Sequence, residues 1–118
     1  MAATAKNTSR ILSEVKAFTN RQLGLYPQAV YLDRHDSTLT IAMRGILPEI
    51  ERTGAGDKRV ADLIIRTYKA SFDTVRKILE SRLAPVLGHV PENSAFMIDP
   101  QTNCATLIIN LQHKRSSR

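Results

Sequence analysis

Apolar residues recur at helical spacing in the first part of the chain, over residues 9–23. Except for one adjacent pair, they lie three to five positions from one another. This spacing predicts an amphipathic helix. The glycine that follows is a common helix stop. The residues of this pattern are Ile11, Leu12, Val15, Phe18, Leu23 and Gly24.

Two shorter stretches follow in which apolar and polar residues alternate, residues 30–33 and 39–43. Alternation with a period of two is typical of strands that have one buried face. Between them, residues 34–37 carry the charged and small side chains of a turn. This part of the chain therefore predicts a β-hairpin.

The second half begins with a glycine-rich segment, residues 54–56, and a long helical pattern. Apolar residues keep three-and-four spacing from Val60 to Val86, and Asp57 and Gly88 are suitable as N-cap and helix stop. Two alternating stretches, residues 95–99 and 105–111, then predict a second hairpin.

The predicted order is helix, strand, strand, helix, strand, strand. The simplest packing is an α+β two-layer sandwich, in which a four-stranded antiparallel sheet carries both helices on one face. We expect one domain over residues 11–112, with polar basic tails at residues 1–10 and 113–118.

One face of such a sheet is left without helices, and its residues are not uniformly polar. If Leu107 and Ile109 point at the helices, Thr106 and Ile108 point away from them, together with Tyr31. A surface of this mixed kind suits partial burial. We therefore expect a homo-oligomer, a dimer in its simplest form, that uses the sheet face or the long second helix.

The chain is strongly basic, with a net charge of +6 and a pI near 9.9. Most of the excess lies in residues 1–10 and 113–118, which hold five basic residues and no acidic one. These segments are either solvated tails or anchors for anionic lipid or nucleic acid. The candidate contacts with an anionic partner are Lys114, Arg115, Arg118, Arg76 and Lys77.

The sequence contains no recognisable catalytic or metal-binding motif. His35, His89 and His113 lack the spacing of a zinc site, and Cys104 has no partner for a disulfide. We expect no enzymatic activity, no metal and no cofactor. The single cysteine and the absence of a long apolar run predict a cytoplasmic protein, with peripheral contact at the inner face of the membrane as an option.

The pattern of glycine, proline, acidic and apolar residues around the first hairpin resembles that of the MpsC-like family of small bacterial proteins. The second half agrees in its long helix and in the ends of its strands. The matching residues are Leu23-Gly24, Pro27, Val30, Asp36, Leu39-x-Ile41, Gly45-x-Leu47, Glu51, Gly88, Asp99 and Leu111. Two positions depart from the family pattern, Pro48 and the glycine-rich segment 52–58.

The family is named after a component of a sodium-translocating system that generates a membrane potential. The resemblance implies an accessory or regulatory protein of a membrane ion or bicarbonate transport system, with transport subunits as partners. It brings no catalytic residues. The alternative is a small RNA- or ribosome-binding protein, which rests on charge and topology because the chain lacks the GXXG loop of a KH module.

Overall fold

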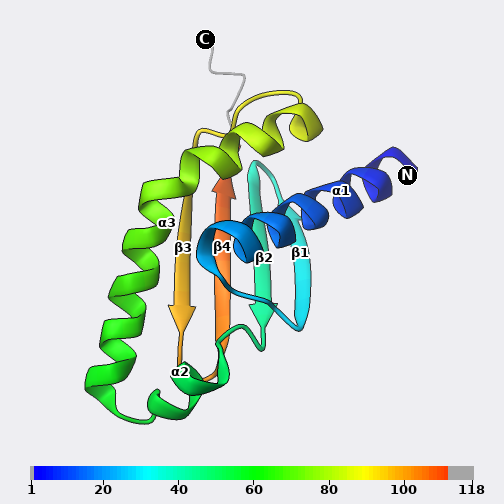
Figure 1. Cartoon of the computed structure of the whole chain (residues 1–118). Helices are drawn as coiled ribbons and strands as arrows, with labels where there is room; N and C mark the ends of the chain where they lie inside the picture. Colours follow the sequence, from blue (N-terminus) through cyan, green and yellow to red (C-terminus); the bar gives the residue numbers. More distant parts are fainter. Residues whose placement is uncertain (1, 112–118) are drawn as a thin grey trace.

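Two units, each a helix followed by a hairpin, make up the chain (Figure 1). The structure, a computed structural model, describes residues 2–111, and the side chains of residues 7–111. In chain order the elements are α1 (Ala2–Phe18), the π-helical turn η1 (Thr19–Leu23), β1 (Ala29–His35), β2 (Thr38–Arg44), α2 (Glu49–Gly54), α3 (Lys58–Leu87), β3 (Asn93–Asp99) and β4 (Cys104–Asn110).

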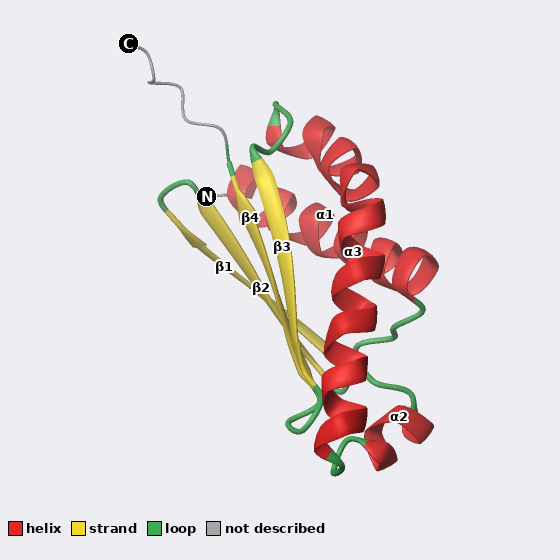
Figure 2. Ribbon diagram, turned by 90° about the vertical axis from the view of Figure 1, so that its left-hand side faces the viewer, coloured by secondary structure: helices red, strands yellow, loops and turns green. Residues whose placement is uncertain are grey.

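The four strands form one antiparallel sheet in the order β1-β2-β4-β3. Each hairpin supplies one central strand, and β2 and β4 pair with each other. The helices pack against one face of the sheet, and no element within residues 2–111 covers the other face (Figure 2). The predicted α+β two-layer sandwich is confirmed.

The core lies between this sheet and the helices. Inward positions on the strands alternate with outward ones, as in β4, where every second residue is buried. Phe72 of α3 lies at the centre, edge-to-face with Phe18 at 5.9 Å and stacked on Phe96 at 5.5 Å between ring centroids. These three rings connect α1, α3 and β3, and they are the only phenylalanines of the chain.

The long helix α3 has the ends that its sequence predicts. The Asp57 side chain accepts a hydrogen bond of 2.8 Å from the Arg59 N–H and so caps the first turn. At the other end, Gly88 takes the left-handed conformation with φ of 88°, and its N–H bonds to the Ala84 carbonyl. At 30 residues the helix is about 45 Å long.

Two local predictions differ from the structure. Residues 2–10, which were predicted as part of an N-terminal tail, are helical and belong to α1, because their alanines favour helix. A short helix, α2, extends the single turn expected near residue 50. The C-terminal tail, residues 113–118, lies outside the described residues.

The first hairpin is also tighter than expected. Its strands reach His35 and Thr38, which pair directly, so only Asp36 and Ser37 form the turn. Asp36 has φ of 53°, a conformation that aspartate tolerates better than most residues. Arg34 therefore belongs to β1 and not to the turn, and strand alternation points it to the helix side of the sheet.

Candidate interaction surface

The uncovered sheet face carries a row of four outward residues, one from each strand. Strand register places Tyr31, Ala42, Thr106 and Met97 side by side across β1, β2, β4 and β3. Tyr31 is 54% exposed and Met97 is 53% exposed. The row therefore has a large apolar side chain at each edge and small residues between them.

A second row lies one step along the strands and continues the same surface. It contains Asp33, Thr40, Ile108 and Ala95. We call this uncovered side of the sheet the open face, and the two rows form its central part. Most of its residues are apolar or small, whereas a solvated face would be expected to carry more charge.

A polar row closes the open face at the hairpin-turn end of β1. Thr38 Oγ1 donates a hydrogen bond of 3.3 Å to Asn110 Oδ1, and Asn110 Nδ2 donates one of 2.6 Å to Asn93 Oδ1. These bonds link three neighbouring strands, β2, β4 and β3, at this end of the open face.

The opposite end of the open face carries two opposite charges. Register places Arg44 beside Cys104 and Cys104 beside Asp99. No ion pair joins Arg44 or Asp99 to another residue within the described part of the chain, although Asp99 accepts a hydrogen bond from the Gln101 N–H. Both charges are thus available to a partner that covers this face.

The structure brings together the three residues predicted for an oligomer face. Tyr31 and Thr106 lie in the same row, and Ile108 lies in the next row, two residues along β4 from Thr106. Sequence reasoning missed Met97. The signal was present, because alternation along residues 95–99 places Ala95, Met97 and Asp99 on one face.

Of the predicted anion contacts, the structure describes only Arg76 and Lys77, both on α3. Arg76 donates to the buried Glu80 carboxylate at 3.2 Å, so its charge is engaged within the fold. Lys77 is exposed on α3 and makes no ion pair with any described residue. Lys114, Arg115 and Arg118 lie outside the described residues.

Other basic side chains of α3 are paired as well. Lys69 bonds Asp73 at 3.2 Å, and Arg82 reaches Glu14 of α1 at 3.5 Å. Such pairs are worth little as stabilisation, but they divide the basic charge of the helix into local, partly neutralised groups. The helix therefore presents a mixed surface and not a continuous basic stripe.

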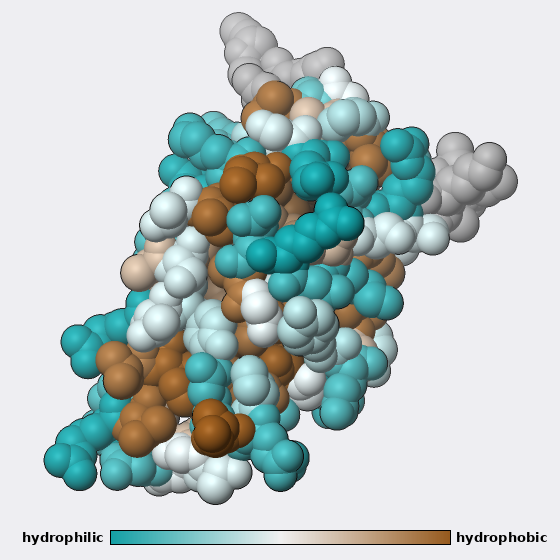
Figure 3. Space-filling model, in the orientation of Figure 1, coloured by the Kyte–Doolittle hydropathy of each residue, from teal (hydrophilic) through white to brown (hydrophobic). Residues whose placement is uncertain are grey.

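A second apolar surface lies where α2 meets the start of α3. A groove of about 260 Å³ is lined there by Ile50, Glu51, Val60, Leu63, Ile64, Thr67 and Tyr68. Ile50 is 83% exposed and Leu63 is 57% exposed. Figure 3 shows apolar side chains gathered at this end of the molecule. The groove lies on the long helix, which is the alternative place that the sequence predicts for an oligomer contact.

Within residues 2–111, no three His, Cys, Asp or Glu side chains are grouped so that they could hold a metal ion. His35 faces Asp36 at 3.6 Å on the surface, and Cys104 Sγ donates to the Thr102 carbonyl at 3.3 Å. Among the described helices, none combines the length and the apolar character that a membrane crossing requires.

The comparisons with known proteins add no relative to this picture. Protein-family models, curated proteins and solved structures were compared with the chain, and none of them matches it. Membership of the MpsC-like family therefore stays a prediction that rests on the residues named for it.

Proposed function

We propose that this chain is a non-enzymatic protein that acts through protein–protein interaction and whose open face binds a second copy of itself. The observation that carries the proposal is the row of Tyr31, Ala42, Thr106 and Met97 on a sheet face that no described element covers. Exposed apolar patches of this kind mark interaction sites in soluble proteins.

The charges at the end of this face are complementary to those of a second copy. A two-fold axis along the strands places β1 of one copy over β3 of the other, because it reverses the strand order and keeps the rows. Tyr31 then meets Met97 of the second copy, a favourable contact between sulfur and an aromatic ring. In the same arrangement Arg44 lies next to Asp99 of the second copy, which pairs the two open charges.

The area of the face predicts how tight the dimer is. Four strands of seven residues cover roughly 24 Å by 19 Å, about 450 Å² per copy. Two copies would bury about 900 Å², below the roughly 1,200–2,000 Å² of stable interfaces. We therefore expect a reversible dimer whose population depends on concentration.

Sedimentation equilibrium tests the dimer. Met97→Lys should weaken the dimer about tenfold or more, because it replaces the apolar side chain that meets Tyr31 of the second copy with a charged amine. Leu63→Lys is the matched control, since it makes the same kind of change on the α2–α3 groove. A dimer that is weakened by Leu63→Lys and not by Met97→Lys would move the interface to the long helix and contradict the proposal.

The orientation has its own test. Arg44→Asp should weaken the dimer, and Asp99→Arg added to it should restore association, because the two charges exchange places across the interface. Circular dichroism monitors folding, since Asp99 also accepts a bond from the turn at Gln101. If the double variant stays as weak as the single one, the two-fold axis does not run along the strands.

We propose further that the protein serves as an accessory or regulatory partner of a membrane ion or bicarbonate transport system, as its resemblance to the MpsC-like family implies. Affinity capture from native cells with membranes retained tests this. Recovery of transport subunits supports the assignment. Recovery of ribosomal particles that is lost after nuclease treatment contradicts it.

RNA binding is the alternative, and the net charge of +6 is the observation in its favour. Removal of residues 112–118 tests it and shortens none of the described elements, whereas removal of residues 1–10 would shorten α1. RNA affinity that falls steeply with salt and is lost on this truncation would favour the alternative.

A further inference from the structure

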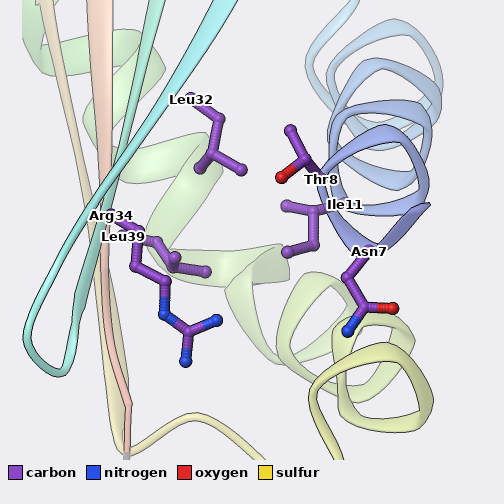
Figure 4. Close-up of a pocket in the computed structure, with 6 residues that line it drawn as sticks. All are labelled: Asn7, Thr8, Ile11, Leu32, Arg34 and Leu39. Carbon is purple, nitrogen blue, oxygen red and sulfur yellow. The ribbon is translucent and has the colours of Figure 1, made fainter. Parts of the chain in front are cut away.

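A small cavity lies on the helix side of the sheet, between α1 and the edge strand β1 (Figure 4). Its volume is about 120 Å³, and one water molecule needs roughly 10–15 Å³ on the same measure. A ligand of several heavy atoms therefore fits. The lining residues are Asn7, Thr8, Ile11, Leu32, Arg34 and Leu39.

The lining is divided into an apolar part and a polar part. The side chains of Ile11, Leu32 and Leu39 form apolar walls, and Ile11 and Leu39 belong to the core. Figure 4 shows the Arg34 guanidinium at one end of the space, with the Asn7 amide facing it from α1. A ligand that matches both parts has a polar group at one end and a short apolar chain at the other.

The charge of the site selects the polar group. Among the described lining residues, Arg34 alone is charged, and it makes no ion pair with any described residue. Its guanidinium presents paired N–H donors in a planar fork that matches the two oxygens of a carboxylate. The Asn7 amide can add a further donor.

We propose that this cavity binds a small aliphatic carboxylate, with its oxygens on Arg34 and its alkyl chain against Ile11, Leu32 and Leu39. The site lies on the opposite side of the sheet from the open face. It is therefore independent of the dimer, and either proposal can fail without the other.

A structural explanation of Arg34 has to be separated from this one. Charged residues that point inward on an edge strand can protect the edge from pairing with another chain. If that were the only role of Arg34, the loss of its charge would promote association through β1 and would not change the response to a carboxylate.

Amide and guanidinium NMR spectra of the full chain, recorded during a titration with butyrate, test the proposal. We expect saturable shifts confined to the cavity residues. n-Butanol, which has the same chain and no charge, should bind much more weakly. Inorganic phosphate should also bind weakly, since the apolar walls give it no contact. Equal binding of butanol, or binding of phosphate alone, would overturn the assignment to carboxylates.

Substitutions then test whether Arg34 supplies the positive charge that binds butyrate. Arg34→Gln should raise the dissociation constant of butyrate about tenfold or more. Arg66→Gln, the same change on the exposed surface of α3, should leave it unaltered. Arg34→Lys keeps the charge and loses the fork, so it should weaken binding to a smaller extent, and it decides the matter if Arg34→Gln does not fold. An unchanged dissociation constant in the folded Arg34 variants would overturn the proposal.

Discussion

The Ser94 hydroxyl of β3 donates a hydrogen bond of 2.7 Å to the carboxylate of Glu80 on α3. Glu80 is only 6% exposed, and Arg76 from the preceding turn of the helix donates to the same oxygen at 3.2 Å. A buried carboxylate is costly unless it is paired and hydrogen-bonded, so this contact ties the long helix to the edge of the sheet.

Ser94→Ala should lower the free energy of unfolding by about 1–2 kcal/mol, because it removes a charge-assisted hydrogen bond from a buried group. Urea denaturation measures the change. Ser81→Ala, an exposed serine next to Glu80, is the control and should stay within about 0.5 kcal/mol of the wild type. Equal effects of the two substitutions would show that the bond to Glu80 contributes nothing.

The exit of β2 depends on one side chain of the second hairpin. Asn103 Oδ1 accepts hydrogen bonds from the N–H groups of Ile46 and Leu47, at 3.1 and 2.8 Å. Asn103 has φ of 58°, which asparagine tolerates. We expect Asn103→Ala to cost about 3 kcal/mol, since it leaves two N–H groups without an acceptor and strains the backbone.

Two further substitutions at this position separate the causes. Asn103→Asp keeps the acceptor oxygen and should cost less than about 1 kcal/mol, whereas Asn103→Gly removes the acceptor but relieves the backbone and should fall between the two. Thermal and urea denaturation give the order. A cost for the aspartate variant as large as that for alanine would show that the acceptor oxygen is not what matters.

Tyr68 makes stability depend on alkaline pH. Its hydroxyl donates a hydrogen bond of 2.7 Å to Glu51 of α2. Burial first, and then this hydrogen bond and the charge of Glu51, raise the pKa of Tyr68 above its ordinary value of 10.0. The folded state therefore keeps a proton that the unfolded chain loses, so the contribution is complete below pH 10.0 and falls as the pH rises above that value.

Urea midpoints measured between pH 9 and pH 11 check this sign. Above pH 10, the wild type should lose up to roughly 1.4 kcal/mol per pH unit more than Tyr68→Phe does, since phenylalanine has no proton to release. Tyr68→Phe should itself cost about 1 kcal/mol at neutral pH through the lost hydrogen bond. Parallel curves for the two proteins would contradict the prediction.

Gly45 and Gly24 both have positive φ, but they differ in the space around them. A Cβ at Gly45 would lie 2.5 Å from Oε1 of Gln28, whereas a Cβ at Gly24 would meet nothing within 4 Å. Gly24→Ala should cost about 1 kcal/mol from backbone strain alone, and Gly45→Ala should cost about 1 kcal/mol more because Gln28 must move.

The double variant Gly45→Ala/Gln28→Ala isolates the steric part. It should recover most of the difference between the two glycine variants, because the flexible side chain that obstructs the new methyl group is gone. Denaturation midpoints of the wild type, Gly45→Ala, Gln28→Ala and the double variant form the cycle. Strictly additive effects would mean that Gln28 accommodates the methyl group without cost.

Much of the fold could be predicted because it depends on local patterns. The alternation of Leu107 and Ile109 with Thr106 and Ile108 identified the buried and the open side of β4, and Asp57 and Gly88 marked the ends of α3. The helix at residues 2–10 was missed because these residues include no large apolar side chain, so they show no helical periodicity. The extent of β1 was missed because charged residues such as Arg34 are also typical of turns.

Sequence periodicity by itself determined the number of strands, the long helix, the two layers and the side of the sheet on which Tyr31 and Ile108 lie. The tertiary structure decided the strand order, the meeting of Asn103 with the exit of β2, the pairing of Glu80 with Ser94 and the position of Arg34 above a cavity. Periodicity reports only which side of its own element a residue occupies. These contacts join residues 14 to 57 positions apart, or, for the cavity, residues of α1 and β1, and only the packing of the whole chain brings such partners together.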